Sequence, residues 1–434
     1  MVVPWDDGPV LYGIASLPRP AKLNFMTSVC LYFKVHRPYS LKKYMASDVG
    51  ACHDYEDTAS DKISMDQLAD ECCLPANEVL YTAIKQNKGK FRISFSISGV
   101  VLELMQRYRP DVIKSFKKLA ATGCVELLSE TYYNSLSALH SPLEFQRQII
   151  KHSEWVYDLF NMEPTVFRNT ELIHNNRIAG LVGELGMKGI LCEGVDRILQ
   201  GRSANRLYSV PGNTEISLLL RNVALSDDIA FRFGDPNWSE HPLTAEKFAH
   251  WLHCHPGDTE AINLFMDYET FGIHKQAESG IFEFLASLPA AVLTHPDFTF
   301  STPSEVIEQK FPGDVYDVTK TISWEDRSET NCVWCENMMQ NNMLKKIYDI
   351  EKLVSFSEDE KAMEVWSRLQ AADYFYSMDT NRKNQSNSSI TAADVFKHYS
   401  NMVADLEISL IRKEIKSNQK ASVSKRQLFN ILHN

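Results

Sequence analysis

The sequence lacks the features that would direct a protein to a membrane or to nucleic acid. No apolar run approaches the roughly 20 residues that a membrane-spanning helix needs. The first ten residues, MVVPWDDGPV, carry an acidic pair where a secretory signal has basic residues. The net charge of −11 leaves no basic excess to neutralise phosphate groups. We therefore expect a main partner that is neither a membrane nor a nucleic acid.

Cysteine is present but shows no pairing or metal-binding pattern. The nine cysteines are scattered, and several lie in apolar runs, as buried free thiols do. Cys332 and Cys335 form one CxxC, but a zinc site needs a second ligand pair. His250, His253 and His255 fit the end of an amphipathic helix better than a metal site. P-loop and dinucleotide glycine patterns are also missing. We predict no metal, no cofactor and a reducing, cytoplasmic location.

Strand-like and helix-like segments alternate from Thr27 to about residue 310. The strand-like runs cover residues 27–35, 91–98, 123–128, 165–172, 187–192, 215–221 and 261–267. The helix-like stretches between them cover residues 100–120, 142–160, 175–185, 244–254 and 280–288. This alternation is typical of a parallel α/β sheet or barrel. About seven strands in this length favour the barrel.

The two ends of the chain have a different character. Residues 1–25 show no sustained periodicity, and we interpret them as a flexible extension, with an ordered arm as the alternative. After about residue 310 strand signals fade, and helical patterns cover 336–356, 358–378, 391–416 and 424–432. We predict a catalytic domain over 26–310 and a helical domain over 311–434 that contributes to the active-site cleft.

Two of the predicted strands end in carboxylates. LFMDYETFGIHK (264–275) runs from apolar residues into Asp267, and TVFRNTELIHNN (165–176) ends at Glu171. Such groups are costly to desolvate without a partner or a task, and active sites form at the strand ends of α/β barrels. Either residue could instead cap a following helix. Their joint occurrence favours a paired-carboxylate enzyme, with one group as acid and the other as nucleophile or base.

Other side chains could complete such a site. His36 ends the first strand and could bind a sugar hydroxyl, or bond to backbone in a loop. Glu126 lies inside an apolar strand and needs a ligand or an ion-pair partner. Arg168 precedes Glu171 and could donate to its carboxylate, which would keep it ionised.

Aromatic residues of the helical region are candidates for contact with sugar. Helical spacing in VWSRLQAADYFYSM (365–378) is typical of core packing. The alternative is that one residue of this segment lies over the open end of the barrel and contacts sugar: Trp366, Gln370 or Asp373. Trp334 is a further candidate, because aromatic faces complement the CH faces of sugar rings.

Together these segments resemble glycoside hydrolase family 57, which comprises retaining enzymes active on α-glucans. KVHRPY, GCVELL, FRNTEL, FMDYETFG and the Trp366 segment are similar, in this order, to the five motifs of that family. The resemblance covers about residues 27–380 and implies an incomplete (β/α)7 barrel followed by helices. It implies Glu171 as nucleophile and Asp267 as general acid/base, with His36, Glu126 and Glu269 at the donor-sugar subsite.

Three positions bear on substrate preference. The stretch SDDIAFRF (226–233) looks like that of members grouped as α-amylases, so Asp228 could be a rim residue or part of a capped loop. Arg37 replaces the usual Gln of the first motif, and Asn134 stands where a His is common in similar sequences. An Arg there could pair with a carboxylate and alter subsite affinity.

These observations favour an α-amylase-like retaining hydrolase acting on α-1,4-glucans such as glycogen, starch or maltooligosaccharides. A 4-α-glucanotransferase or glucan-branching enzyme is the first alternative. A catalytically weak glucan-binding protein is the second, because of Arg37 and Asn134. A metal-dependent deacetylase-like hydrolase would need an Asp/His ligand set at strand ends, which we cannot assemble from the sequence.

Overall fold

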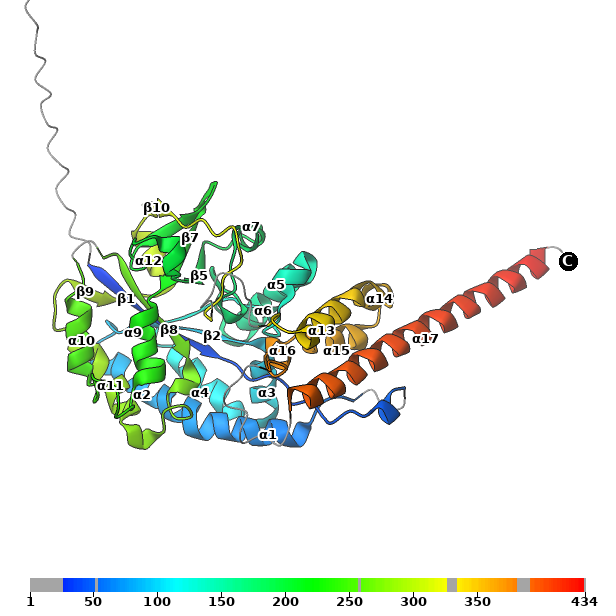
Figure 1. Ribbon diagram of the computed structural model, residues 1–434, viewed down its shortest axis with the longest axis horizontal. Helices are drawn as coiled ribbons and strands as arrows, with labels where there is room; N and C mark the ends of the chain where they lie inside the picture. The colour runs from blue at the N-terminus through cyan, green and yellow to red at the C-terminus, as the bar shows by residue number, and fades with distance from the viewer. Residues whose placement is uncertain (1–25, 51–53, 257–258, 326–333, 381–390, 433–434) are drawn as a thin grey trace, which may run out of the picture.

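The fold is an α/β sheet with helices around it, seen in a computed structural model (Figure 1). The structure describes residues 26–50, 54–256, 259–325, 334–380 and 391–432. The predicted extension 1–25 and Cys332 lie outside these ranges. None of the described helices combines the length and apolar character needed to cross a membrane.

The strands follow the predicted runs closely and include three short ones that the sequence did not indicate. Their bounds are β1 (Thr27–Val35), β2 (Ile93–Ile97), β3 (Val125–Leu127), β4 (Val166–Arg168), β5 (Gly189–Glu193), β6 (Leu207–Val210), β7 (Asn213–Arg221), β8 (Ala261–Asp267), β9 (Phe298–Phe300) and β10 (Asp314–Val315). β6, β9 and β10 are the strands that we did not predict.

The helices of the first three quarters of the chain lie between the strands. They are α1 (Thr58–Gln67), η2 (Leu68–Cys73), α2 (Leu74–Gln86), α3 (Gly99–Tyr108), α4 (Pro110–Ala120), α5 (Ser137–His140), α6 (Pro142–Phe160), α7 (Asn176–Gly183), α8 (Asp196–Leu199), α9 (Val223–Asp227), η4 (Asp228–Arg232), α10 (Ala245–His253), α11 (Ile281–Val292) and α12 (Pro303–Gln309). Short 3-10 turns are η1 (Ala46–Asp48), η3 (Thr170–Leu172), η5 (Tyr268–Thr270) and η6 (Ala277–Ser279).

The described chain from Met338 onward contains helices. It contains α13 (Met338–Asp349), α14 (Glu351–Phe356), α15 (Glu360–Arg368), α16 (Ala372–Tyr376) and α17 (Ala392–Leu432). Figure 1 shows these helices on one side of the strands, with the far part of α17 extending away from the body. The prediction of two helices over 391–416 and 424–432 was wrong, because α17 continues through the polar stretch between them.

Seven parallel strands in the described part of the chain are paired one after another. β1 pairs with β2 and with β8, β2 pairs with β3, β4 pairs with β5, and β5 pairs with β7. β7 meets β8 through Arg221 and Asn263, and the chain after β3 meets β4 through a bridge between Ser129 and Phe167. The carboxyl ends of all seven strands therefore face the same edge.

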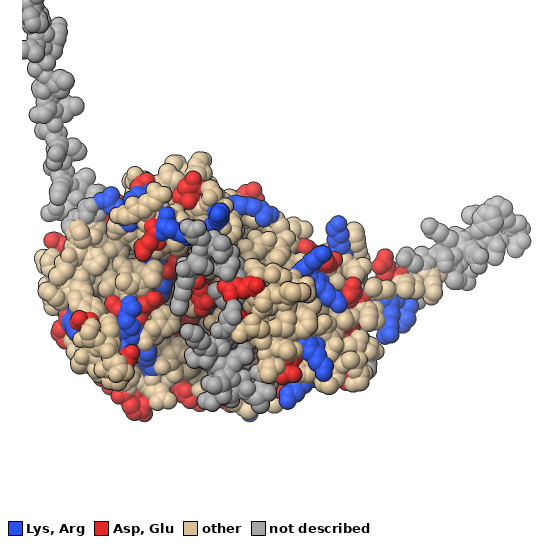
Figure 2. Space-filling view, viewed as in Figure 1, with Lys and Arg blue, Asp and Glu red and all other residues tan. Residues whose placement is uncertain are grey.

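The burial of β1 agrees with its place in the sheet, between β8 and β2. All nine of its residues are buried, which matches a parallel strand covered on both faces. One large hydrophobic cluster joins strand residues such as Phe167 and Ile190 to Trp334, Leu344 and Tyr399 of the helical region. On the face drawn in Figure 2, basic and acidic side chains are interspersed over the body.

Candidate active site

A cavity of about 580 Å³ opens at the carboxyl ends of the parallel strands. It brings together segments that are up to several hundred residues apart in the chain. Seven of the ten predicted site residues line it: His36, Arg168, Glu171, Asp267, Glu269, Trp334 and Asp373. Both predicted catalytic carboxylates are therefore in the same cavity, at the ends of β4 and β8.

Glu171 occupies a strained turn directly after β4. Its φ of 54° and ψ of 26° are left-handed, and the next residue, Leu172, has a φ of 50°. A non-glycine residue adopts this region at a cost, and such strain gathers at functional sites. The turn is fixed by neighbouring hydrogen bonds, including one from the amide of Leu172 to the carbonyl of Asn169 at 3.0 Å. The chain thus turns Glu171 at the end of the strand toward the cavity.

Both carboxylate oxygens of Glu171 accept a hydrogen bond. Lys34 Nζ donates to Oε1 at 2.8 Å, and Trp324 Nε1 donates to Oε2 at 2.7 Å. Burial alone would raise the pKa of Glu171, but the charges of Lys34 and Arg168 and the bond from Lys34 bring it below its usual value. Glu171 is therefore held as an oriented carboxylate, which is the form a nucleophile needs.

Asp267 ends β8 and is exposed to the cavity. The six residues before it are buried, and Asp267 itself is exposed. It is the register partner of Lys34 in the neighbouring strand β1. Its carboxylate can therefore be reached by a molecule in the cavity, as a group that exchanges protons with substrate must be.

Glu269 lies two residues beyond Asp267 and is paired with Arg37. Arg37 Nη2 is 3.1 Å from Glu269 Oε2, and His274 Nε2 is 3.6 Å from the same oxygen. Burial raises the pKa of Glu269 to about 7, with Arg37 opposing this rise and Asp267 adding to it. The Arg that departs from the first motif thus pairs with a carboxylate of the cavity, as we expected of it.

His36 and Asp373 join the strand end to the helical region. His36 Nδ1 is 2.7 Å from Ser98 Oγ, and His36 Nε2 is 3.0 Å from Asp373 Oδ2. Asn134 Nδ2 donates to the same Asp373 oxygen at 3.1 Å. Burial would raise the pKa of Asp373, but His36, Lys34 and Asn134 hold it well below its usual range. Asp373 is therefore a fixed acceptor on the cavity wall.

Arg168 is buried beside the cavity. Its Nη1 is 3.8 Å from Glu130 Oε2, and the Glu130 side chain has no exposed surface. Burial would lower the pKa of Arg168, but Tyr32, Glu171 and Glu130 raise it above its usual value. The guanidinium remains a cation near Glu171, but the hydrogen bonds described for the Glu171 carboxylate come from Lys34 and Trp324 instead of from Arg168.

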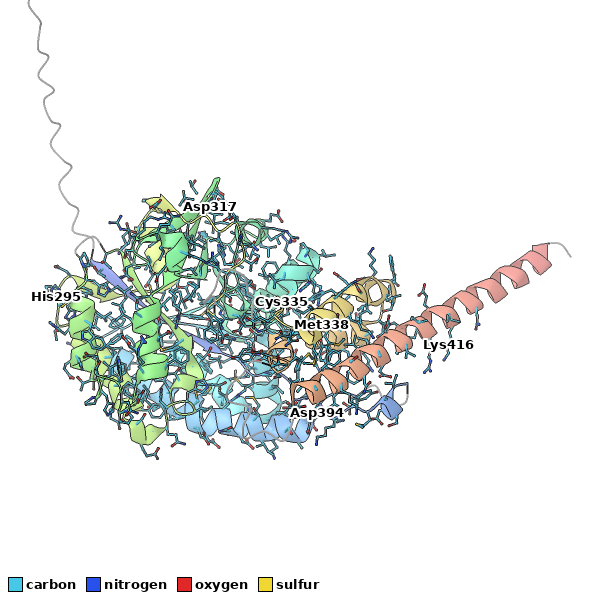
Figure 3. The ribbon with its side chains drawn as sticks, viewed as in Figure 1. His295, Asp317, Cys335, Met338, Asp394 and Lys416 are labelled. Carbon is cyan, nitrogen blue, oxygen red and sulfur yellow. The ribbon has the colours of Figure 1, made fainter. Side chains whose placement is uncertain are left out.

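Aromatic side chains form another part of the wall. Trp334 is almost fully buried and lies 6.2 Å from the ring of Tyr376, while Trp324 and Phe231 are stacked at 6.4 Å with an angle of 17°. Phe231 is 55% exposed and could contact a ligand. Cys335, which follows Trp334 in the chain, and Met338, which begins helix α13, are labelled in Figure 3.

Three predicted substrate-binding residues do not line the cavity. The Glu126 carboxylate accepts a bond from the amide of Ser304 at 3.0 Å, at the start of α12. Asp228 pairs with Arg232 at 2.6 Å. Trp366 is buried, and its Nε1 donates to the carbonyl of Ile347 at 2.6 Å. The geometry gives each of these residues a structural contact instead. Core packing of Trp366 and a capped loop at Asp228 fit the structure, whereas the contact described for Glu126 is a backbone hydrogen bond and not the ion pair that was the alternative.

Sequence reasoning missed several residues of the wall, chiefly Lys34, Trp324, Phe231 and Tyr376. Lys34 carried a usable signal, because a lysine in a fully buried strand needs a counter-charge. Trp324 carried no signal in the sequence, because its hydrogen bond to Glu171 joins residues 153 positions apart and depends on the fold. Phe231 lies in the stretch 226–233, where we had considered only charged residues.

The fold and this cavity define a class of enzyme. A held carboxylate and an accessible carboxylate at the ends of two strands around one cavity, surrounded by hydrogen-bonding and aromatic side chains, are typical of glycosidases. The comparison with family models agrees: the model of Glycosyl hydrolase family 57 matches residues 30–319. The chain belongs to glycosyl hydrolase family 57 and is a glycosidase, which confirms the resemblance drawn from the motifs.

Individual relatives support the same family. A protein of Methanocaldococcus jannaschii with the name "Putative alpha-amylase" is 37% identical over 393 residues, which cover 86% of this chain and 83% of that protein. A GH57 branching enzyme of Thermococcus kodakaraensis shares the fold with a TM-score of 0.64 at 13% identity, over 89% of this chain and 90% of that one. A 4-alpha-glucanotransferase of Thermococcus litoralis gives 0.62 at 14% identity over 81% of this chain; the match spans only 56% of that enzyme.

Proposed function

We propose that this protein is a retaining glycosidase that acts on α-1,4-glucans, with Glu171 as nucleophile and Asp267 as general acid/base. The observation that carries the proposal is the sharing of one cavity by two carboxylates with different surroundings. Glu171 is partly buried with both oxygens bonded, and Asp267 is exposed. That difference suits one group for attack and the other for proton transfer.

The reaction follows from these two roles. The Glu171 carboxylate attacks the anomeric carbon while the glycosidic C–O bond breaks, and the Asp267 proton passes to the leaving oxygen. Asp267, now ionised, takes a proton from water, whose oxygen attacks the anomeric carbon and releases Glu171. A retaining mechanism of this kind predicts about 5–5.5 Å between the two carboxyl groups.

The remaining wall residues are suited to hold sugar hydroxyls. Asp373, fixed by His36 and Asn134, is an acceptor, and Arg37 with Glu269 offers a donor and an acceptor side by side. Arg168 adds a buried cation. We propose that the sugar is contacted by His36, Glu269, Arg168, Trp334 and Asp373, of which the motif resemblance implies His36 and Glu269.

The names of related proteins support a glucan as the substrate. They include an alpha-amylase, a branching enzyme and a 4-alpha-glucanotransferase. The name 4-alpha-glucanotransferase denotes a transfer reaction, and the stacked pair Trp324 and Phe231 offers a surface on which an acceptor chain could lie. Transglycosylation is therefore the second candidate, and it uses the same two carboxylates.

We also propose an incomplete (β/α)7 barrel for residues 26–310 and a helical C-terminal domain over 311–434. Successive pairing of seven parallel strands supports the barrel, and the run of helices from α13 to α17 supports the second region. A cytoplasmic location remains our proposal. It is supported by six of the described cysteines, which are free thiols: Cys30, Cys72, Cys73, Cys124, Cys192 and Cys254.

Maltoheptaose is the substrate for the first test, with products resolved by chromatography. We expect shorter maltooligosaccharides from the wild type and none from Glu171→Ala, while longer products as well would establish the transferase. An inert wild type would favour a glucan-binding protein.

Azide assigns the two roles in an independent experiment. With α-maltosyl fluoride and azide, we expect a β-glycosyl azide from Glu171→Ala and an α-glycosyl azide from Asp267→Ala. The reverse result would exchange the roles of the two carboxylates. Circular dichroism checks that both variants are folded.

A further inference from the structure

Lys34 is a buried cation between the two carboxylates. Tyr32, Lys34 and His36 alternate along and just beyond β1, so they point to the same side, and all three line the cavity. The Lys34 side chain is 9% exposed, and its Nζ lies 2.8 Å from Glu171 Oε1. On the adjacent strand β8 its register partner is Asp267. Paired strands lie about 4.8 Å apart, so Lys34 is close to the reacting carboxylate on each side.

Lys34 carries a charge in this position. Burial favours the neutral amine, but the carboxylates of Glu171, Asp267 and Asp373 together outweigh this effect, and the pKa of Lys34 lies above its ordinary value. The charged groups that surround it come from three other segments: Arg168 and Glu171 at the end of β4, Asp267 at the end of β8, and Asp373 on α16. Its own strand end adds His36. Of these groups, Glu171 and Asp267 are the two whose charge changes in the proposed reaction.

The double displacement keeps the total charge of this trio constant. Before attack, Glu171 is a carboxylate and Asp267 holds a proton. After the glycosidic bond breaks, Glu171 is an uncharged ester, and Asp267 is the carboxylate, because its proton left with the departing oxygen. One negative charge has therefore moved from one side of Lys34 to the other, and it returns when water releases the ester.

We propose that Lys34 is a positioning residue shared by both steps: it is the counter-ion of Glu171 in the free enzyme and of Asp267 in the covalent intermediate. This inference rests on the proposed function and deepens it. A fixed cation at this place orients Glu171 for attack and then stabilises the charge that forms on Asp267. The net charge of the site stays the same in both steps. The high free-energy cost of an uncompensated charge in a buried site is therefore avoided.

The two steps can be measured separately with a 4-nitrophenyl α-maltooligoside. Its leaving group needs little protonation, so the burst of nitrophenol reports attack by Glu171, and the steady-state rate reports release by water. The variants are Lys34→Met, which keeps length and removes charge, and Lys34→Arg, which keeps charge. The control is Lys310→Met, because Lys310 is equally buried but bonds to the carbonyls of Met26 and Glu260 outside the cavity.

We expect Lys34→Met to slow both the burst and the steady state by about 10²- to 10³-fold, as loss of one charge-stabilising donor does. Lys34→Arg should recover much of both rates. The acidic limb of the kcat/KM profile should move upward by about 1–3 pH units in Lys34→Met, because Glu171 loses its nearest cation. Lys310→Met should leave rates and profile unchanged, with thermal unfolding as the check on folding.

Other outcomes overturn the inference. A folded Lys34→Met variant that keeps the wild-type rate of either step shows that Lys34 does not serve both carboxylates. An unmoved acidic limb shows that it does not hold Glu171 ionised. If the wild type itself is inert toward glucans and aryl maltooligosides, the proposed function fails, and the role of Lys34 fails with it. If the wild type is active and Lys34→Met has the same rates, the proposed function stands and only the role proposed for Lys34 fails.

Discussion

Arg37 and Asn134 each hold one carboxylate of the cavity wall. Arg37 gives Glu269 a charged partner at 3.1 Å, and Asn134 gives Asp373 a neutral donor at 3.1 Å. Asn134 also has a φ of 50°, which asparagine tolerates better than most residues. Its carbonyl accepts a bond from the amide of Ala372 at 2.9 Å, so this loop and the start of α16 are fixed together. These two residues therefore set the charge and position of acceptors that a sugar would meet.

The raised pKa of Glu269 predicts a pH dependence of stability. Its ordinary value is 4.5 and its value in the fold is about 7, so the folded state binds the proton more tightly. The contribution of Glu269 to the free energy of unfolding is thus largest below pH 4.5 and is lost as the pH rises to 7. A shift of this size corresponds to a loss of up to about 3 kcal/mol.

Urea unfolding at pH 5 and pH 8 tests this expectation. The wild type should lose more stability between these pH values than Glu269→Gln, which has no titrating carboxyl at this position. Glu171 and Asp373 have lowered pKa values, so their contributions to the free energy of unfolding change with pH in the opposite direction. These contributions are present in both the wild type and Glu269→Gln. Glu246→Gln, on the surface of α10, is the matched control. Equal losses in wild type and Glu269→Gln would contradict a raised pKa.

The elements of the fold were predictable where burial has a simple pattern. The seven parallel strands come from apolar runs that end in polar residues, and α6 begins at Pro142 after the Ser141 cap and ends at Phe160, as predicted. Helix α1 was missed because TASDKISMDQ has only two large apolar residues and so almost no periodicity. The polar stretch inside α17 wrongly suggested a break in that helix.

Of the active site, only the residues that end an apolar strand could be predicted from the sequence. Glu171 and Asp267 could be found because each follows an apolar strand. Their partners could not, because contacts such as Lys34 with Glu171 join residues 137 positions apart. Glu126 shows the limit most clearly. Its place in an apolar strand indicates that a partner exists, but not that the partner is the first turn of α12.

The contact of Glu126 with α12 leads to a prediction at the scale of the helix. Glu126→Ala removes the acceptor for the amide of Ser304, which lies in the first turn of α12 (Pro303–Gln309). Loss of such a cap costs about 0.5–2 kcal/mol of stability. We expect a lower thermal midpoint with an unchanged KM for maltooligosaccharides. Glu126→Gln, which keeps an oxygen there, should be closer to the wild type. A raised KM in both variants would instead return Glu126 to the sugar site.

At the scale of the whole molecule, the active-site cavity draws on both parts of the chain. Trp324, Trp334 and Asp373 follow residue 310, and Asp373 bonds to His36 at the end of β1. The hydrophobic core is shared in the same way, because Phe167 and Ile190 pack in one cluster with Trp334 and Tyr399. Residue 310 therefore marks a change in secondary structure within a common core.

This shared core predicts that residues 26–310 do not fold alone. Without the helical region, part of the strand layer would expose buried apolar surface, and Glu171 would lose the indole of Trp324. We expect this fragment to aggregate or to lack a cooperative thermal transition, while the full chain unfolds in a single calorimetric transition. A chain ended after Lys416 is the control, because Leu410 is the last described buried residue of α17. It should keep the wild-type midpoint and activity. A soluble 26–310 fragment with its own sharp transition would instead show two independent folding units.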